Sequence, residues 1–503
     1  MKKRFAIVMT LIMTFSLLAG CSSESEQSGS AEENKLILGI ESELTSFDVE
    51  NGDFALDFVI RRCLYEPLVH VDPVSGEEEM RLAESYTVSD DKTVYTFKLR
   101  PDVKMHDGST LTADDVVYSL NLTKESSYVG KNLSAMKQAR AVDDHTVEVT
   151  LNAPYAAFMK NLSMCFVLSA EAHRAGTDAF NEEPVGCGPY KFVSYENDNK
   201  ITLEAFDEYY RDTAPIETIE IRMFADTSSL AIAMESGELD AAAGINPVDY
   251  ENVVSNDNIV VDEIATTKFC MLSMNEETEP FNDKKVRQAI NYAIDRQFVL
   301  DASREGKGNP TSLLFNTAMT CTEGVEEYEY DPEKAKQLLE EAGISLPLTL
   351  NTKLSTYEGC KTEAEAIQES LANVGINVEI EILESGALYG GLASGDIPFS
   401  LTRLGTSAVD PDQYYNMVSE NGFSSLNYSR YVNDEVEELM VQARSEQDEE
   451  ERDTLYREAL EIIQDDAPYA VIYEMPDLNA SVKNLNVNWG LNGMYYLYDF
   501  SWK

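Results

Sequence analysis

The chain has 503 residues and a formal net charge of −51, with 90 acidic against 39 basic side chains. This excess of negative charge repels nucleic-acid phosphates and anionic membrane surfaces, so it excludes both as charge-matched partners. Apolar residues make up 43% of the chain, as in packed globular proteins. Because the length exceeds what one core usually serves, we expect two or three domains.

The N-terminus has the parts of a secretory signal. Lys2-Lys3-Arg4 precedes an apolar run over 5–18 that is too short to span a membrane. Leu18-Ala19-Gly20-Cys21 then resembles a bacterial lipobox, whose cysteine is acylated after cleavage in front of it. We therefore expect residues 1–20 to be a lipoprotein signal peptide, Cys21 to be lipidated, and 21–34 to form a tether. The body would then lie on the extracytoplasmic face of the membrane, held only by lipid.

After a predicted first strand at 35–40, the segment 82–121 predicts a hairpin followed by a helix. Apolar and polar side chains alternate along 94–100, which is typical of a half-buried strand. Asp107-Gly108 predicts a second turn, and Thr112 with Asp115 predicts a capping box. The residues expected on buried faces here are Tyr95, Phe97, Leu99, Val116, Val117 and Leu120.

The rest of the chain alternates strands and helices. Strands are predicted at 141–151 (a hairpin), 216–225, 377–383 and 470–474. Helices are predicted at 227–236, 286–294, 332–342, 363–374, 434–443 and 450–464. A β-α-β-α order favours a mostly parallel sheet with helices on its faces.

The sequence predicts neither catalysis nor a metal centre. The four histidines are dispersed, without an HExxH motif or paired-ligand spacing. We expect two of them, His106 and His145, to be solvated because they lie in or beside turns. No GxSxG elbow, P-loop or EF-hand loop occurs, and acidic pairs are too common to single out a catalytic pair. The expectation is a non-enzyme without cofactor or metal.

The remaining cysteines and glycines carry weak signals. Six cysteines follow Cys21 without a CxxC pair, so we expect them to be mostly free or buried. Gly186 and Gly188 look superficially like a phosphate loop, but GK[ST] is missing.

Several segments, in order, resemble one protein family. Along the chain they are LYEPLV (64–69), LAESYTVSDDKTVYTFKLRPDVKMHDGSTLTADDVVYSL (82–120), PVGCGPYKF (184–192), ESGELDAA (235–242) and MNEETEPFNDKKVRQAINYAIDR (274–296). On these motifs the chain is identified as a member of the family-5 extracellular solute-binding proteins, the dipeptide- and oligopeptide-binding components of ABC importers. Cys187 stands where the family usually has Thr.

The resemblance implies an α/β, two-lobed periplasmic-binding-protein-like fold of type II, with an extra α+β domain. The ligand cleft would lie between lobes joined by a hinge near Cys270 and Pro476. The implied boundaries are 35–55, 183–270 and 477–503 for lobe I, 56–182 for the extra domain, and 271–476 for lobe II.

The implied function is a receptor that captures peptides by lobe closure and delivers them to an ABC permease. A monomer is expected, with a small-molecule or peptide ligand, permease subunits as partners and no nucleic acid. Alternatives are a non-peptide ligand on the same fold (a nickel complex, haem or an oligosaccharide) and a peptide-signal receptor. A tethered hydrolase is disfavoured because the sequence has no recognisable catalytic motif, and an adhesin is disfavoured because it has no repeats.

The resemblance also implies ligand-binding positions, where a peptide would bond through its backbone like an added strand. They are Asp53, Tyr128, Asn246, Phe269, Arg403, Gly405, Thr406, Ser407 and Asp410. One position departs from the family: peptide binders commonly have an Asp shortly before the acid-Pro pair, where it meets the ligand ammonium. Here Ser407 or Val409 precedes Asp410-Pro411. Either another acid, such as Asp410 or Asp53, takes over, or the ligand is not a free-amine peptide.

Overall fold

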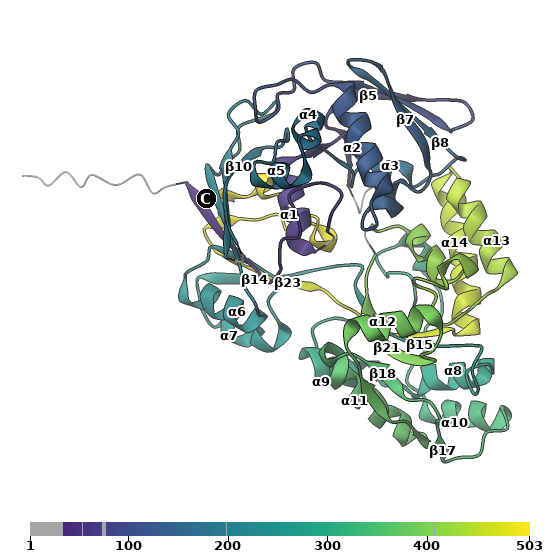
Figure 1. Ribbon diagram of the computed structural model, residues 1–503. Helices are drawn as coiled ribbons and strands as arrows, with labels where there is room; N and C mark the ends of the chain where they lie inside the picture. Colours follow the sequence, from purple (N-terminus) through teal and green to yellow (C-terminus); the bar gives the residue numbers. More distant parts are fainter. Residues whose placement is uncertain (1–33, 53, 73–76, 198, 407) are drawn as a thin grey trace, which may run out of the picture.

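The structure is a computed structural model that describes residues 34–52, 54–72, 77–197, 199–406 and 408–503. The predicted signal peptide, Cys21 and the tether up to residue 33 lie outside the described residues. Three sheets organise the rest, and two of them form the cores of two lobes (Figure 1).

The first lobe is built on a seven-stranded sheet with the order β10-β11-β12-β1-β13-β23-β14. Leu36 and Leu38 of β1 are fully buried, as the apolar KLILGI segment predicts. The strands are β1 Lys35–Ile40, β10 Tyr190–Glu196, β11 Lys200–Ala205, β12 Thr218–Met223, β13 Ala241–Ala243, β14 Ile259–Ile264 and β23 Asp477–Val482. Helices α6 Thr227–Ser236 and α7 Tyr250–Val254 accompany this sheet, and α1 Ala55–Leu64 packs against its core. The C-terminal segment adds the pair β24 Leu485–Asn486 and β25 Ser501–Trp502.

The second lobe is built on a six-stranded sheet with the order β16-β22-β15-β21-β18-β20. The strands are β15 Phe269–Met274, β16 Asn309–Pro310, β18 Leu354–Thr356, β20 Ile380–Ile382, β21 Phe399–Leu404 and β22 Tyr469–Glu474. The helices are α8 Lys284–Ala293, α9 Arg296–Arg304, α10 Pro332–Glu341, α11 Lys361–Asn373, α12 Ser385–Ser394, α13 Asp434–Ser445 and α14 Glu449–Asp466. A separate pair joins β17 Leu348–Thr349 to β19 Ile376–Asn377.

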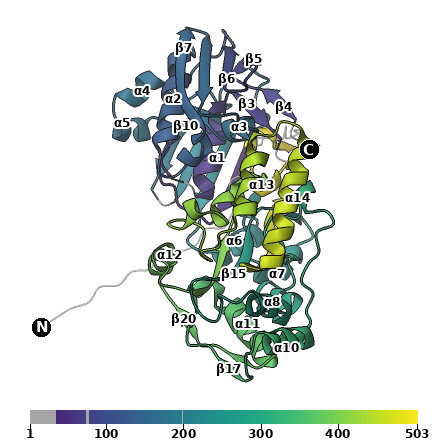
Figure 2. The same cartoon turned by 90° about the vertical axis from the view of Figure 1, so that its right-hand side faces the viewer.

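The third unit is an antiparallel four-stranded sheet, β5-β6-β8-β7, with its own apolar core. Figure 2 shows this unit at the top of the molecule and α8, α10 and α11 at the bottom. The strands are β5 Ala83–Val88, β6 Val94–Leu99, β7 Met136–Asp143 and β8 Thr146–Leu151. The helices are α2 Ala113–Glu125, α3 Phe158–Leu162, α4 Ala170–Arg174 and α5 Thr177–Glu182. Two short pairs, β2 Glu66–Pro67 with β9 Phe166–Val167 and β3 Val69–Val71 with β4 Glu78–Met80, flank them.

The lobes are joined by two crossings of the chain, between β14 and β15 and between β22 and β23. The crossings bond to each other: the Met475 N–H donates to the Lys268 carbonyl at 2.8 Å. The Lys268 ammonium lies 2.7 Å from a carboxylate oxygen of Asp477. Two adjacent extended segments can bend together, so this pair forms the hinge.

Most local predictions are confirmed. The predicted strand at 35–40 and helix at 227–236 match β1 and α6. The capping box of Thr112 and Asp115 opens α2. Tyr95, Phe97 and Leu99 are buried in the four-stranded core, and Val117 is half-buried against it. All six described cysteines are free and buried.

Three predictions are wrong. The sheets are mixed, not mostly parallel: in the described strands of the two lobe sheets, parallel pairs join β1 to β12 and β13, and β18 to β20 and β21. The predicted strand at 377–383 is two fragments, β19 and β20, that pair with different partners. His106 is half-buried and not fully solvated, because its ring bonds the Gly188 carbonyl at 3.1 Å and accepts the Gly186 N–H at 3.3 Å. Burial lowers the pKa of His106 to about 4.

Candidate functional site

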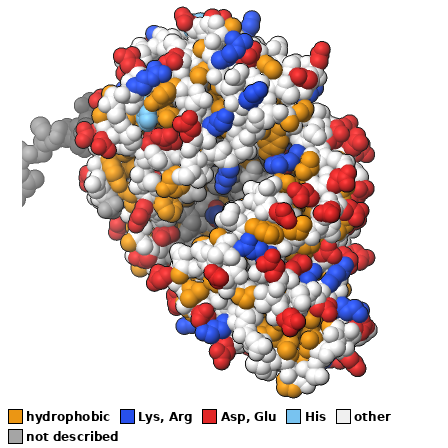
Figure 3. Space-filling model, turned by 45° about the vertical axis from the view of Figure 1, so that its right-hand side comes forward, with side chains coloured by type: hydrophobic (Ala, Val, Ile, Leu, Met, Phe, Trp, Pro, Cys, Tyr) orange, Lys and Arg blue, Asp and Glu red, His pale blue; other side chains and the backbone are white. Residues whose placement is uncertain are grey.

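A cavity of about 480 Å³ lies between the two lobes, beside the hinge. Figure 3 shows the surface hollowed between the upper and lower halves of the molecule. This size suits a small ligand, for which pockets of about 300–1,000 Å³ are usual. The lining comes from the ends of β1 and β13, from α1, from the segment after α2, from the hinge and from the second lobe. The lining residues are Ile40, Glu41, Ala55, Phe58, Val59, Arg62, Tyr128, Val129, Lys131, Asn132, Met164, Ala243, Gly244, Lys268, Gly405, Thr406, Asp477, Asn479, Gly493, Met494 and Tyr495.

Arg62 is the most unusual group in this lining. It lies in the last turn of α1 and is only 3% exposed. Its guanidinium donates to the Phe58 carbonyl at 3.3 Å and lies over the rings of Phe58 and Tyr496, 5.9 and 5.8 Å from their centroids. Among the described residues, no carboxylate forms an ion pair with it. Burial lowers the pKa of Arg62, which shows that its surroundings do not fully compensate the charge.

The adjacent Arg61 has a different role. Its guanidinium donates to the main-chain oxygens of Asp48, Asn51 and Gly52. Neighbouring residues on a helix point about 100° apart, so Arg61 reaches the loop before α1 while Arg62 reaches the cavity. Arg61 therefore stabilises the loop before α1, and Arg62 is the arginine of the two that lines the cavity.

The other charged side chains in the lining differ in whether they are free to bind a ligand. Lys268 and Asp477 neutralise each other across the hinge. Glu41 and Lys131 are exposed, and burial, followed by the charge of Asp226, raises the pKa of Glu41. Among the described residues Glu41 has no ion-pair partner, and it lines the same cavity as Arg62, whose guanidinium has no carboxylate partner there.

Of the positions implied by the family resemblance, three line the cavity: Tyr128, Gly405 and Thr406. Tyr128 is 44% exposed, just after α2. Gly405 packs against Lys268: an added Cβ would lie 3.2 Å from that side chain. The Thr406 N–H donates to the Thr267 hydroxyl at 3.2 Å, which holds this turn of the second lobe against the hinge.

Three other positions lie outside the lining. Asn246 caps the turn after β13, where its side chain accepts the Val248 N–H at 3.2 Å. Phe269 is 3% exposed and packs against Tyr414. Arg403 forms an ion pair with Glu363 inside the second lobe. Asp53 and Ser407 lie outside the described residues.

Asp410 is also away from the lining, and it is fully buried in an ion pair. Its two carboxylate oxygens accept Arg452 Nη2 at 2.7 Å and Nη1 at 3.1 Å, and Lys160 lies at 3.5 Å. Burial raises the pKa of a carboxyl, but here the attraction of Arg452 and then Lys160 prevails and lowers the pKa of Asp410. The Asp410 carboxylate is therefore paired with two cations of the protein itself and does not face the cavity.

Around Asp410, the third unit contacts the second lobe directly; we call these contacts the latch. The Tyr155 hydroxyl donates to Asp412 at 2.8 Å, and the Ala156 N–H donates to the Arg444 carbonyl at 2.8 Å. The Lys160–Asp410 pair completes it. Figure 1 shows α3 beside the ends of α13 and α14. The latch is a second bridge between the halves of the molecule, in addition to the hinge.

Sequence reasoning missed Arg62, Glu41, Lys131 and the C-terminal residues Met494 and Tyr495. Nothing in VIRRCL distinguishes Arg62 from Arg61. The loop 490–495 reaches the cavity only through the packing of the chain end on the first lobe. The available signal was two arginines in the otherwise apolar segment VIRRCL, since cations are rarely buried without a partner.

Comparison with known proteins identifies the family. The profile described as "Bacterial extracellular solute-binding proteins, family 5 Middle" matches residues 77–425. The chain belongs to this family. A dipeptide-binding protein of Escherichia coli K12 is 30% identical over 447 residues, which cover 81% of this chain and 83% of that protein. Heme-binding protein A of Haemophilus influenzae is 28% identical over 442 residues, 81% of this chain and 80% of the relative.

Solved structures of family-5 proteins support the same conclusion about fold. HbpA2 from Haemophilus parasuis superposes with a TM-score of 0.84 at 26% identity, covering 93% of this chain and all of that one. The periplasmic binding protein DppA from Helicobacter pylori, solved with the peptide STSA, gives 0.78 at 27% identity, with 93% and 98% covered. In the part of this family-5 chain that the structure describes, no helix is long and apolar enough to cross a membrane.

Proposed function

We propose that the chain is a lipid-anchored receptor on the extracytoplasmic face of the membrane. It captures a peptide between its lobes, closes on it, and delivers it to an ABC permease without making or breaking a bond. The observation that carries this proposal is the cavity between the lobes, which takes its lining from both of them and from the hinge. We also propose a monomer, the domain boundaries given above, and Tyr128, Gly405, Thr406, Asp53 and Ser407 as members of the binding site.

Closure works through the hinge and the latch. A ligand enters when the lobes separate, which lengthens the Tyr155–Asp412 and Lys160–Asp410 contacts while the two hinge segments bend. A ligand that contacts both lobes favours the closed state, because it binds that state more tightly than the open one. Ligand binding and latch formation are then coupled, and each stabilises the other.

The charges in the lining favour a ligand with an anionic group. Arg62 has no carboxylate partner among the described residues, and a buried unpaired charge is costly. A ligand carboxylate would complete a bidentate pair with its guanidinium. Glu41 is the available carboxylate in the lining, so it replaces the missing Asp as the partner of a peptide ammonium. Dipeptides and glutathione, the ligands in the names of several relatives, carry both groups.

A second candidate keeps the fold and changes the ligand. The heme-binding relative matches the chain about as well as the dipeptide-binding one does, so haem is the leading alternative, ahead of a nickel complex or an oligosaccharide. A receptor for exported peptide signals would use the same binding chemistry. Turnover of a peptide or glycoside would contradict the proposal that the chain is not an enzyme.

A thermal-shift titration with matched peptides tests the proposal. We expect free di- and tripeptides to raise the melting temperature saturably, since a ligand at about 100 times its Kd adds roughly 2.7 kcal/mol of stability. C-terminal amides should lose the Arg62 pair, and N-acetyl peptides the Glu41 pair. Haem added to the same protein gives an absorbance change if the alternative is correct. No shift with any peptide, on protein freed of co-purified ligand, contradicts the peptide proposal.

The matched variants are Arg62→Met and Lys131→Met, because both remove one cation from the same lining. Loss of one partner of a desolvated pair costs about 2–5 kcal/mol, so Arg62→Met should weaken binding of a free-acid peptide at least about 30-fold. Lys131 is exposed, and its loss should change Kd only a few-fold. Equal effects of the two substitutions would contradict a specific role for Arg62.

A further inference from the structure

Three side chains that could hold a metal ion meet at the junction of the first lobe and the third unit. Asp48 and Glu50 lie in the loop between β1 and α1, and His173 lies on α4. One ligand atom from each of the three lies within 4.8 Å of the others. None of these residues lines the cavity between the lobes. The site is therefore separate from the proposed ligand cleft, and the inference does not rest on the proposed function.

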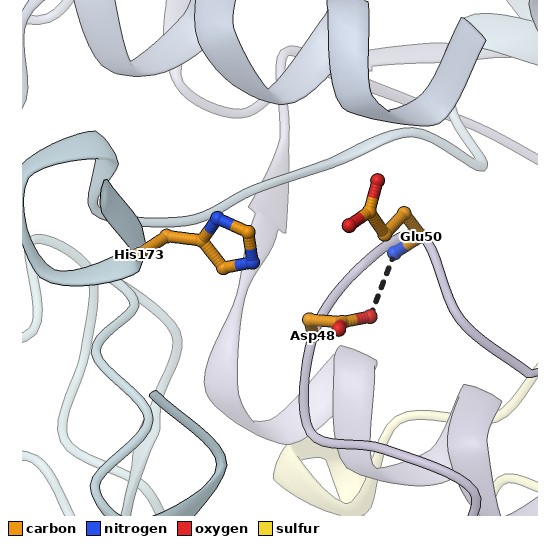
Figure 4. Close-up of side chains that lie close together, drawn as sticks. All are labelled: Asp48, Glu50 and His173. Atoms are coloured by element: carbon orange, nitrogen blue, oxygen red, sulfur yellow. Dashed lines mark hydrogen bonds between the residues drawn. The ribbon is translucent and has the colours of Figure 1, made fainter. Parts of the chain in front are cut away.

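His173 directs an unpartnered nitrogen into this group. The residue is 6% exposed, and its ring packs edge-on against Phe180. Nδ1 lies 2.9 Å from the Tyr118 hydroxyl, whereas Nε2 is buried without a hydrogen-bond partner among the described residues. Figure 4 shows the ring projecting from α4 toward the two acidic side chains. A buried imidazole nitrogen without a partner is costly, and the hydrogen bond at Nδ1 fixes the ring in the orientation of a ligating histidine.

The Asp48 carboxylate is rigidly placed. It is fully buried, and its oxygens accept the N–H groups of Glu50 at 3.1 Å and Asn51 at 2.8 Å, and the Asn51 side-chain amide at 2.7 Å. The first of these bonds is drawn in Figure 4. A carboxylate has about four lone-pair sites, so it can still coordinate a cation.

Glu50 brings a second carboxylate to this group. It is partly buried, and its carboxylate has no hydrogen bond or ion pair with any residue that the structure describes. Burial, followed by the charges of Asp48 and Glu125, raises the pKa of Glu50. The Arg61 guanidinium bonds the main-chain oxygen of Asp48. Burial also lowers the pKa of His173, which favours the neutral imidazole that binds metals.

We propose that Asp48, Glu50 and His173 bind one divalent transition-metal cation of the Zn²⁺ or Mn²⁺ type. One imidazole and two carboxylates suit such ions, whereas Ca²⁺ and Mg²⁺ prefer oxygen ligands alone. The cation neutralises the two facing carboxylates and gives Nε2 of His173 its missing partner. It also joins the loop after β1 to α4, and so fixes the first lobe to the third unit. The partial exposure of Glu50 leaves a route for the ion to enter.

Metal binding to the purified, chelator-treated protein tests this site. A Cys21→Ser background removes the one cysteine outside the described residues, and the other six are buried. Equilibrium dialysis against Zn²⁺ should leave one ion per chain, and Co²⁺ should give visible absorption bands that Zn²⁺ abolishes. Ca²⁺ at the same concentration should not displace Co²⁺. Zn²⁺ should also raise the melting temperature of the protein.

Glu50→Gln is the decisive variant, because it keeps the shape of a side chain that has no hydrogen-bond or ion-pair partner within the described parts of the chain. It should raise the Kd for Zn²⁺ at least tenfold, and His173→Gln should do the same. His145→Gln is the matched control, since His145 is exposed in the β7–β8 turn, and it should bind as the parent does. Three results would overturn the proposal: no ion retained by the parent, unchanged binding by Glu50→Gln, or a preference for Ca²⁺ over Zn²⁺.

Discussion

Changing Asp410 to Asn removes the charge that neutralises Arg452 while keeping the shape of the side chain. Asp410 is fully buried, and both of its oxygens accept guanidinium nitrogens of Arg452. Asn retains an oxygen for the Asp412 N–H, which Asp410 now accepts at 3.0 Å. The same oxygen can still accept Arg452 Nη2, and the Ala443 carbonyl and Tyr456 hydroxyl remain as acceptors, but the guanidinium, whose side chain is 11% exposed, loses its charged partner. Breaking a buried pair in this way costs about 3–5 kcal/mol, so we expect that loss of stability.

Urea unfolding of Asp410→Asn measures the loss, with Asp114→Asn as the control. Asp114 pairs with Arg174 at 2.7 Å, but the two side chains are 62% and 49% exposed, so that change should cost less than about 1 kcal/mol. The pKa of folded Asp410 is lowered, so its contribution is present above the unfolded pKa and disappears as pH falls through the folded value. The difference between parent and variant should therefore shrink below about pH 4. Equal stabilities at pH 7, with a loss of peptide affinity instead, would refute this reasoning and make Asp410 a ligand-binding residue.

Three further changes test other parts of the structure. Burial raises the pKa of Glu66 to about 7, so the folded state holds its proton more tightly than the unfolded state does. The stability of the protein should therefore fall as the pH rises from about 4.5 to 7, and thermal unfolding of Glu66→Gln should show a smaller fall. Gly188→Ala should lower the melting temperature, because a Cβ there would lie 2.4 Å from a main-chain oxygen of α1, whereas Gly386→Ala meets nothing within 4 Å and should not. Tyr155→Phe removes the latch bond to Asp412, so scattering should report a larger radius of gyration without ligand and an unchanged one with ligand.

Local patterns predicted the local structure well, because their causes are local. The capping box at Thr112 satisfies helix N–H groups within four residues, so its sequence is sufficient to locate the start of α2. Val286, Ala289, Ile290 and Ala293 recur at the period of a helix, and all four are buried in α8.

The sheet topology could not be predicted in the same way. A β-α-β order predicts parallel pairing only if the chain returns to the same sheet beside its previous strand. Here the chain leaves the first lobe after β14 and returns only at β23, which pairs antiparallel with both β13 and β14. The glycines at 186 and 188 illustrate the same point. They are needed because main-chain atoms of Cys63 and Leu64 approach within 2.4 Å of where a Cβ would lie.

The cavity residues, too, could be predicted only in part. Family resemblance gave Tyr128, Gly405 and Thr406, whose positions in the chain are set by motifs. Arg62 could not be chosen over Arg61, because only the direction in which each leaves α1 distinguishes them. Sequence spacing does not single out His173, yet it lies beside Asp48 and Glu50, which come more than 120 residues earlier in the chain. Spacing identifies ligands that share one element, and it says nothing about those that a fold brings together.

The net charge of −51 and the unpaired Arg62 act over different distances. At physiological ionic strength the Debye length is about 8 Å, so the acidic surface repels a large polyanion that must approach many carboxylates at once. A small ligand with one carboxylate interacts mostly with its immediate neighbours, and in this cavity they include the Arg62 guanidinium, which has no carboxylate partner among the described residues. The overall charge therefore argues against nucleic acid and leaves an anionic small ligand fully compatible with this cavity.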